Sequence, residues 1–208
     1  MVIHKILDEV FSTWSNVAVL RVLNHHVLGL SGREVSRLAG MSPKNCIITL
    51  TGLENLGLAI RIRGGRDHLF TLNREHFLVK EAIAPLFNTE EKFREAIYAD
   101  IKKGLGKLCN SVYVFGSVAR REENIDSDLD LCVIYDSEHK KEPLENAVYD
   151  LALKVRRMYS VNISAYYVTV KQFSIKAKTN KAPIADVVKE GKLLFGNSIK
   201  VLLNAKRN

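Results

Sequence analysis

The chain of 208 residues carries 31 Lys and Arg against 23 Asp and Glu, a net charge of +8, and 47% of it is hydrophobic. This length allows one large or two small domains with buried cores, and no run of about 18 residues lacks charge, which excludes a membrane-spanning helix. The cysteines are too far apart for a zinc site or a disulfide framework: Cys46, Cys109 and Cys132. Because the N-terminus also lacks a signal-peptide pattern, we expect a cytoplasmic protein.

The charge is unevenly distributed along the chain. Residues 1–85 carry ten Lys and Arg against seven Asp and Glu, residues 86–170 twelve against fourteen, and residues 171–208 nine against two. An acidic middle is expected around a cation site. The basic end is typical of a segment that meets polyanions, either nucleotide phosphates or nucleic acid. A solvated end is the alternative, and residues 199–208 are expected to form a basic tail.

Helical patterns dominate the N-terminal part of the chain. Residues 8–28 have apolar side chains at helical spacing, which predicts a first helix. Ser31 and Glu34 have the spacing of a capping box, in which each residue bonds the backbone N–H of the other. This pair predicts a second, short helix over residues 31–39.

A third helix and a hairpin follow. Ser42 and Pro43 are a cap followed by a favourable first helical residue, and Gly57 ends the helix that they begin. Its apolar residues at three-residue steps are expected to face inward: Ile47, Leu50, Leu53 and Leu56. Two strand-like stretches, 58–63 and 68–72, then flank a glycine turn and predict a β-hairpin.

Helix, short helix, turn, helix and basic hairpin is the order of a winged helix-turn-helix, and residues 1–85 resemble that DNA-binding family. The resemblance implies that the third helix enters the major groove and that the hairpin meets phosphates or the minor groove. The residues expected to face DNA are Lys44, Asn45, Ile48, Thr49, Arg61, Arg63 and Arg66. A winged helix on a palindromic site works as a symmetric pair, so we expect a homodimer. A protein-binding winged helix is the alternative.

A linker helix is predicted over residues 86–106, where Gly104 and Gly106 end it. A second domain is expected to follow at residues 107–198. Its first strand is the apolar run 112–115, which closes on a Gly-Ser turn.

The Gly-Ser turn is followed, after ten further residues, by Asp128-Leu129-Asp130. Alternation of acids with leucines predicts a strand, so both carboxylates point to the same face with Cα atoms roughly 7 Å apart. Two carboxylates on a rigid edge can hold Mg²⁺, which takes its other ligands from water and substrate phosphates. Gly116 would let the backbone approach a triphosphate, Ser117 would offer a hydroxyl, and a helix that begins near Val118 would direct N–H groups at the anion.

A calcium loop and a solvated acidic turn are two other interpretations of the acidic stretch. A calcium loop needs Gly at its sixth and Glu at its twelfth position, and counting from Asp126 gives Leu131 and Ser137. The calcium loop therefore fails. A solvated acidic turn explains poorly why apolar residues follow so closely.

The Gly-Ser and Asp-x-Asp pattern resembles the DNA polymerase beta-type nucleotidyltransferases, especially the small, minimal members. Residues 183–196 add a helix followed by a strand, an ending common in that family. The resemblance implies an α+β fold with a mixed sheet flanked by helices, Mg²⁺, and a nucleoside triphosphate such as ATP. It makes Asp128 and Asp130 the catalytic metal ligands. Nucleotide binding would fall to Gly116, Ser117 and Arg120, although Arg120 could instead pair with nearby acids.

Members that transfer nucleotides usually carry a third carboxylate on the next strand, expected here over residues 161–168. That position reads Asn162, with Ser164 on the same face, and neither accepts a proton at neutral pH. Two functions therefore stay open. One is a DNA-binding transcriptional regulator with a Mg²⁺-dependent domain that transfers a nucleoside monophosphate to an acceptor hydroxyl, for which the family suggests a partner protein. The other is a non-catalytic regulator whose second domain only binds a nucleotide or a partner protein.

Overall fold

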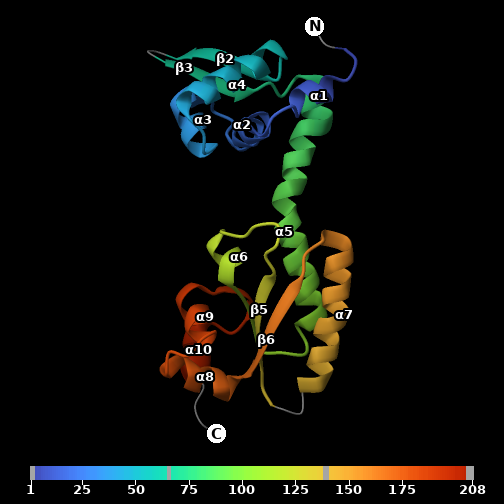
Figure 1. Cartoon of the computed structure of the whole chain (residues 1–208), viewed down its shortest axis with the longest axis vertical. Coiled ribbons are helices and arrows are strands. Elements are labelled where there is room, and N and C mark those ends of the chain that lie inside the picture. Colours follow the sequence, from blue (N-terminus) through green and yellow to red (C-terminus); the bar gives the residue numbers. More distant parts are fainter. Residues whose placement is uncertain (1–2, 65–66, 138–140, 205–208) are drawn as a thin grey trace. The chain divides into compact units, whose positions relative to one another are not determined.

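A computed structural model describes residues 3–64, 67–137 and 141–204 (Figure 1). The chain divides into two compact units, residues 1–92 and 93–208. The division falls inside one long helix, α5 (Ala84–Leu105), which occupies the segment where the linker helix 86–106 was predicted. Among the helices of the described segments, none has both the length and the apolar character needed to cross a membrane.

The N-terminal unit combines helices with a small antiparallel sheet of order β1-β3-β2. Its elements are α1 (Ile6–Val10), α2 (Trp14–His25), β1 (Leu30–Ser31), α3 (Gly32–Leu38), α4 (Pro43–Asn55), β2 (Ala59–Gly64), β3 (Asp67–Leu72), the π-helical segment η1 (Val79–Ile83) and the first part of α5. The predicted hairpin is present as β2 and β3.

The single helix predicted over residues 8–28 is wrong, because the chain forms two helices there. Thr13 has extended backbone angles, and its side-chain oxygen accepts a hydrogen bond from the Asn16 backbone N–H at 3.3 Å. A cap of this kind satisfies a free N–H at the start of a helix, so α2 begins at Trp14 and α1 ends before it.

The predicted caps of the next two helices are confirmed. Ser31 Oγ accepts from the Glu34 N–H at 3.3 Å, and the Glu34 carboxylate accepts from the Ser31 N–H at 2.8 Å. Ser42 Oγ accepts from the Asn45 N–H at 3.3 Å, directly before Pro43. The reciprocal pair fixes where α3 starts, and the single Ser42 cap bond fixes where α4 starts.

The buried face of α4 differs from the predicted one. Ile47, expected to face inward, has 46% of its surface exposed, whereas Thr49, expected to face DNA, is only 7% exposed. The helix buries residues at i, i+3, i+4 and i+7: Cys46, Thr49, Leu50 and Leu53. The prediction used uniform three-residue steps. Because a helix has 3.6 residues per turn, such steps move gradually around the helix and do not stay on one face.

The C-terminal unit is built on a four-stranded mixed sheet of order β6-β5-β4-β7, as the α+β prediction required. Its elements after α5 are β4 (Ser111–Phe115), α6 (Gly116–Arg120), β5 (Leu129–Tyr135), α7 (Lys141–Tyr159), β6 (Ile163–Thr169), α8 (Val170–Lys178), α9 (Ile184–Glu190), β7 (Lys192–Gly196) and α10 (Ile199–Asn204). Strands β5 and β6 are parallel, and the other two pairs are antiparallel. The predicted helix and strand at 183–196 are α9 and β7.

The two faces of this sheet bury different helices. Val112, Leu131 and Val133 pack with the buried side chains of α5 and α7. On the opposite face, Tyr113 and Cys132 pack with residues of α8, α9 and α10, which lie together beside the sheet in Figure 1. Alternate residues of β5 therefore contact different helices, as the period of a strand requires.

Part of the predicted basic tail is folded. Residues Ile199–Asn204 form α10, in which Leu202 is buried against the second face of the sheet. Residues 205–208 lie outside the described part of the chain.

The observed face of α4 predicts a difference between two neighbouring truncations. Leu50→Ala should lower the free energy of unfolding by about 2–5 kcal/mol, because it leaves a cavity at a fully buried position. Ile48→Ala, at a position 62% exposed, should change it by no more than about 0.5 kcal/mol. Urea denaturation followed by circular dichroism measures both, and equal losses would contradict the assigned face.

Candidate functional site

Asp128 and Asp130 lie at the start of β5. The strand begins at Leu129, so Asp128 directly precedes it and is exposed, whereas Asp130 lies within it and is half-buried. Asp130 is paired in register with Phe115 of β4 and with Ser164 of β6. The central position of β5 in the sheet therefore holds the Asp130 backbone from both sides.

Neither carboxylate is neutralised within the described part of the chain. No Lys, Arg or His side chain lies within ion-pair distance of Asp128 or Asp130 there, and no side chain donates a hydrogen bond to either. Two neighbouring negative charges without a cation attract a positively charged ligand.

Gly116 brings the backbone close to the Asp130 carboxylate. Its φ of +71° lies in the left-handed region, and a Cβ atom built there would overlap the Asp130 Oδ2 atom. Only glycine therefore fits beside Asp130 without displacing the carboxylate. The glycine turn and the acidic strand, predicted from the sequence as two halves of one site, meet at this contact.

Ser117 follows Gly116 inside α6 and is half-buried. Its hydroxyl has no hydrogen-bond partner among the residues that the structure describes. The helix is a single short stretch that begins at Gly116, two residues earlier than the predicted start near Val118. Ser117 thus stands beside the glycine contact with an unused hydroxyl.

Two polar residues, Asn162 and Ser164, lie near the position where a third carboxylate is expected. Asn162 lies just before β6 rather than within a strand, and its carbonyl accepts a hydrogen bond from the Leu129 N–H at 2.8 Å. Ser164, not Asn162, is the register partner of Asp130. Both residues are exposed at this sheet edge. They offer neutral oxygens where the family pattern has a carboxylate.

Arg120 is held by two glutamates. Its guanidinium bonds Glu122 at 2.7 Å and Glu190 of α9 at 2.5 Å. Hydrogen bonds to Glu122 and then Glu190 raise the pKa of Arg120 above its ordinary value. This is the ion-paired alternative weighed for Arg120. The sequence pointed to Glu122, but nothing in it indicated that Glu190, far along the chain, would lie close.

The residues present fit Mg²⁺ bound together with a nucleotide. In the described segments no group of three or more His, Cys, Asp and Glu side chains is placed to hold a metal by itself. Mg²⁺, however, is commonly held by one or two carboxylates and completes its shell with substrate phosphates and water. Asp128 and Asp130 supply that donor set, and the Gly116 turn leaves room for a ligand where a side chain would intrude.

The residues predicted to contact DNA fall into different groups. Lys44, Asn45 and Arg63 are exposed, as DNA binding would require. Arg61 instead donates to Glu54 at 2.6 Å and lies 5.2 Å from the centre of the Phe70 ring. The remaining predicted contact, Arg66, lies outside the described residues.

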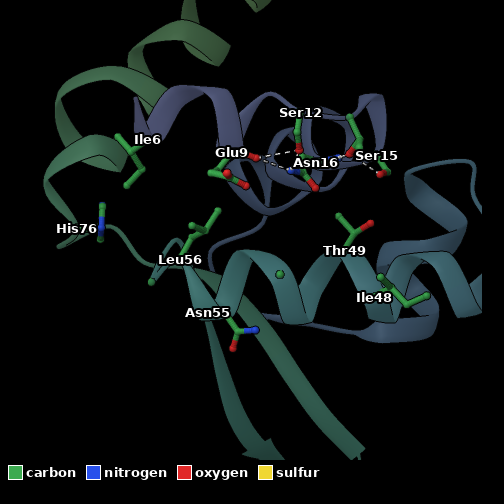
Figure 2. A pocket seen from close by; sticks show the side chains of 13 residues that line it. Ile6, Glu9, Ser12, Ser15, Asn16, Ile48, Thr49, Asn55, Leu56 and His76 are labelled. Atoms are coloured by element: carbon green, nitrogen blue, oxygen red, sulfur yellow. Dashed lines mark hydrogen bonds between the residues drawn. The ribbon is translucent and has the colours of Figure 1, made fainter. Parts of the chain in front are cut away.

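A pocket of about 900 Å³ lies within the N-terminal unit, between the start of α2 and the second half of α4 (Figure 2). Asn16 donates to the Glu9 carbonyl at 3.0 Å and to Ser12 Oγ at 3.3 Å on its rim. Thr49 lines this pocket, but no residue of the predicted nucleotide site does. With Glu9 as its only carboxylate, this pocket lacks the paired acids of the β5 edge.

The contact between Gly116 and Asp130 predicts a double-mutant result. Gly116→Ala should lower the free energy of unfolding by about 2–4 kcal/mol, because it combines a left-handed alanine with the overlap. In the Asp130→Ala background the loss should shrink, since only a Cβ at 3.5 Å remains nearby. Urea denaturation of the four proteins measures the coupling.

Gly40→Ala is the matched control. Gly40 has a φ of +64° with no atom within 4 Å of a built Cβ, so this change should cost only about 1 kcal/mol. If Gly116→Ala and Gly40→Ala lowered the free energy of unfolding equally, and Asp130→Ala did not change the Gly116→Ala loss, then Gly116 and Asp130 would not be in close contact.

Comparison with known proteins matches part of the chain to one family. Residues 100–200 match the family described as polymerase beta, nucleotidyltransferase. No curated protein matches the chain.

Two solved structures align with part of the chain. One is a crystal structure of a toxin–antitoxin with AMP-PNP, with a TM-score of 0.35 and 19% identity, and the other is a mutant of the toxin–antitoxin MntA-HpeT, with a TM-score of 0.34 and 18% identity. In each case the likeness covers 51% of this chain and 80% of the other. By the family match alone, residues 100–200 are similar to a nucleotidyltransferase domain of the polymerase beta type.

Proposed function

We propose that the C-terminal unit transfers a nucleoside monophosphate from a nucleoside triphosphate to an acceptor hydroxyl, in a Mg²⁺-dependent reaction. The observation that carries the proposal is the pair of Asp128 and Asp130, which have no cation partner among the described residues, with the Asp130 carboxylate against the Gly116 turn. This pair lies in the segment that matches the nucleotidyltransferase family.

The transfer exchanges one phosphorus–oxygen bond for another. The acceptor oxygen forms a bond to the α-phosphorus while the bond from that phosphorus to the bridging oxygen breaks, and pyrophosphate leaves with the electron pair. Asp128 and Asp130 would hold the Mg²⁺, which when bound supplies positive charge to the phosphate oxygens. Gly116 gives the triphosphate access to the backbone, and Ser117 offers its hydroxyl as a hydrogen-bond donor.

The acceptor proton has no obvious protein base. Asn162 and Ser164, the polar residues at the adjacent edge of β6, cannot take a proton at neutral pH. The proton therefore goes to solvent or to a group of the substrate. Arg120 already pairs with Glu122 and Glu190, so it would contact a phosphate only by leaving those carboxylates.

Removal of the carboxylate charges tests the proposed reaction. Asp128→Asn and Asp130→Asn should each lower label transfer from α-labelled nucleoside triphosphates by about a hundredfold or more, because a neutral amide holds the cation poorly. The assay offers all four triphosphates, with hydroxyl-bearing proteins and oligonucleotides as acceptors.

Asp150→Asn is the matched control, since Asp150 is exposed on α7, which packs on the other face of the sheet. It should leave the rate unchanged. Transfer by either site variant at the wild-type rate would overturn the proposal.

A second candidate function is binding of a nucleotide or a partner protein without turnover. The observation that favours it is the absence of a third acid at the sheet edge, where Asn162 and Ser164 stand. A regulator of this kind would use the carboxylate pair only to sense a metal-bound nucleotide.

Restoring the missing acid separates the two candidates. If the site is catalytic, Asn162→Asp should raise the transfer rate by about tenfold or more, because a positioned base typically contributes more than that. Single-turnover measurement with labelled triphosphate reports the rate. Nucleotide binding with no transfer by either protein would favour the sensing function.

We also propose that the N-terminal unit binds DNA as one of a symmetric pair of chains and so regulates transcription. The order α2, β1, α3, α4, β2, β3 and the exposed Lys44, Asn45 and Arg63 support this proposal. The net charge of residues 1–85 is modest, and Arg61 is already paired with Glu54. Binding would therefore depend on few cations.

The DNA-binding proposal predicts an unequal effect of two arginines. Against a 30-bp duplex of random sequence, Arg63→Ala should weaken binding and reduce the salt slope by about one, whereas Arg61→Ala should change the slope less because its charge is already neutralised. Fluorescence anisotropy over about 50–200 mM salt measures both.

Lys80→Ala, on η1, is the control that should leave the slope unchanged. No binding by the wild-type protein at the lowest salt would contradict the proposal.

A further inference from the structure

A half-buried ammonium group lies on the same face of the C-terminal sheet as Asp130. Lys176 of α8 donates a hydrogen bond from Nζ to the Tyr166 hydroxyl at 2.5 Å, and Nζ lies 5.2 Å from the centre of the Tyr166 ring. A hydrogen bond and a cation–π contact to one side chain restrict where the ammonium can be. Lys176 is therefore held over β6 instead of extending freely into solvent.

The strand register places Tyr166, which holds this ammonium, one row along the sheet from Asp130. Asp130 pairs with Ser164, and the next pair on that face is Cys132 with Tyr166. Successive rows on one face of a sheet are separated by roughly 7 Å along the strands. Burial raises the pKa of Cys132 to about 12, and the charge of Lys176 acts in the opposite direction.

The charges on this face are unmatched. Throughout the described ranges, no Asp or Glu carboxylate lies within ion-pair distance of Lys176 Nζ, just as no cation pairs with Asp128 or Asp130. A charge that is partly removed from water is unfavourable unless it is paired. Among the described residues, this face thus presents the unpaired Asp130 carboxylate in one row, with the exposed Asp128 directly before the strand, and the unpaired Lys176 ammonium over Tyr166 in the next row.

One class of ligand matches both the carboxylates and the ammonium. A phosphate group supplies oxygens for an ammonium, and a divalent cation carried with it supplies positive charge for the carboxylates. A free metal would satisfy only the aspartates, and a neutral ligand would satisfy neither. The arrangement selects a metal-bound phosphate.

We propose that Lys176, positioned by Tyr166, binds a phosphate oxygen of the nucleotide that Asp128 and Asp130 hold through Mg²⁺. The inference rests on the proposed function and deepens it, because it names the residue that receives the negative charge of the nucleotide. Tyr166 is a positioning residue: its hydroxyl fixes the ammonium and does not itself contact the nucleotide.

Binding of a fluorescent, non-hydrolysable ATP analogue tests the inference without relying on turnover. In Mg²⁺, Lys176→Gln should weaken binding about tenfold, and Tyr166→Phe, which keeps the ring but loses the hydroxyl, about threefold. Lys178→Gln is the matched control, because Lys178 lies on the same helix, is exposed and should not affect the affinity. Thermal denaturation of each variant checks that it is folded.

Repeating the titration in EDTA separates the two kinds of charge. Without metal, Lys176→Gln should still weaken the residual binding, whereas Asp128→Asn and Asp130→Asn should no longer weaken it, because their effect passes through the cation. Adenosine, which has no phosphate, should bind Lys176→Gln and wild type equally.

Each outcome bears on a different claim. Wild-type affinity in Lys176→Gln, with loss in the aspartate variants, would overturn the role of Lys176 and leave the proposed function standing. An equal loss in Lys178→Gln would also overturn it, since the effect would then be general charge attraction. No binding of the analogue by the wild-type protein would overturn the proposed function and the inference together.

Discussion

The close approach of Gly116 to Asp130 is the constraint on which the candidate site depends. A left-handed backbone at Gly116 places the turn after β4 directly against the carboxylate on β5, and no side chain fits between them. Because β4 and β5 are paired in register up to Phe115 and Asp130, the two halves of the motif are joined by main-chain hydrogen bonds rather than by side chains. The site is therefore as rigid as the centre of the sheet that carries it.

Electrostatics explains why such a site would be left open for a ligand. The other partly buried charges of the C-terminal unit are matched: Lys154 bonds Asp100 at 2.6 Å, and Arg120 bonds Glu190. Those pairs join helices to one another and stabilise the unit. Among the half-buried charges of this unit that the structure describes, Asp130 and Lys176 are the exception, since neither is in an ion pair, and Asp130 and the Tyr166 ring that holds Lys176 lie on one face of the sheet. Charges that a fold leaves unmatched on one face indicate a ligand of matching charge.

Much of this could be read from the sequence, because the informative signals are local. The Ser31 and Ser42 caps, the hairpin, and the Asp-x-Asp strand each follow from residues within a few positions of one another. The predicted buried face of α4 was wrong, because a uniform step of three residues does not follow the 3.6-residue period of a helix. Glu190 beside Arg120, and Lys176 beside Tyr166, depend on how α9 and α8 return to the sheet, and no short pattern encodes that return. The substitution of Asn162 for an acid was visible, but its placement before β6, with Ser164 opposite Asp130, required the register.

The central claim is that the carboxylate pair and the glycine turn together hold a divalent cation with a nucleotide. The most direct measurement is paramagnetic broadening of backbone amide resonances by Mn²⁺ in the presence of a non-hydrolysable nucleoside triphosphate. The account predicts that Gly116, Ser117 and the residues from Asp128 to Asp130 broaden first, and that excess Mg²⁺ reverses the effect. Broadening that begins instead at other acidic positions, such as Glu90 and Glu91 of α5, or none at these residues, would contradict it.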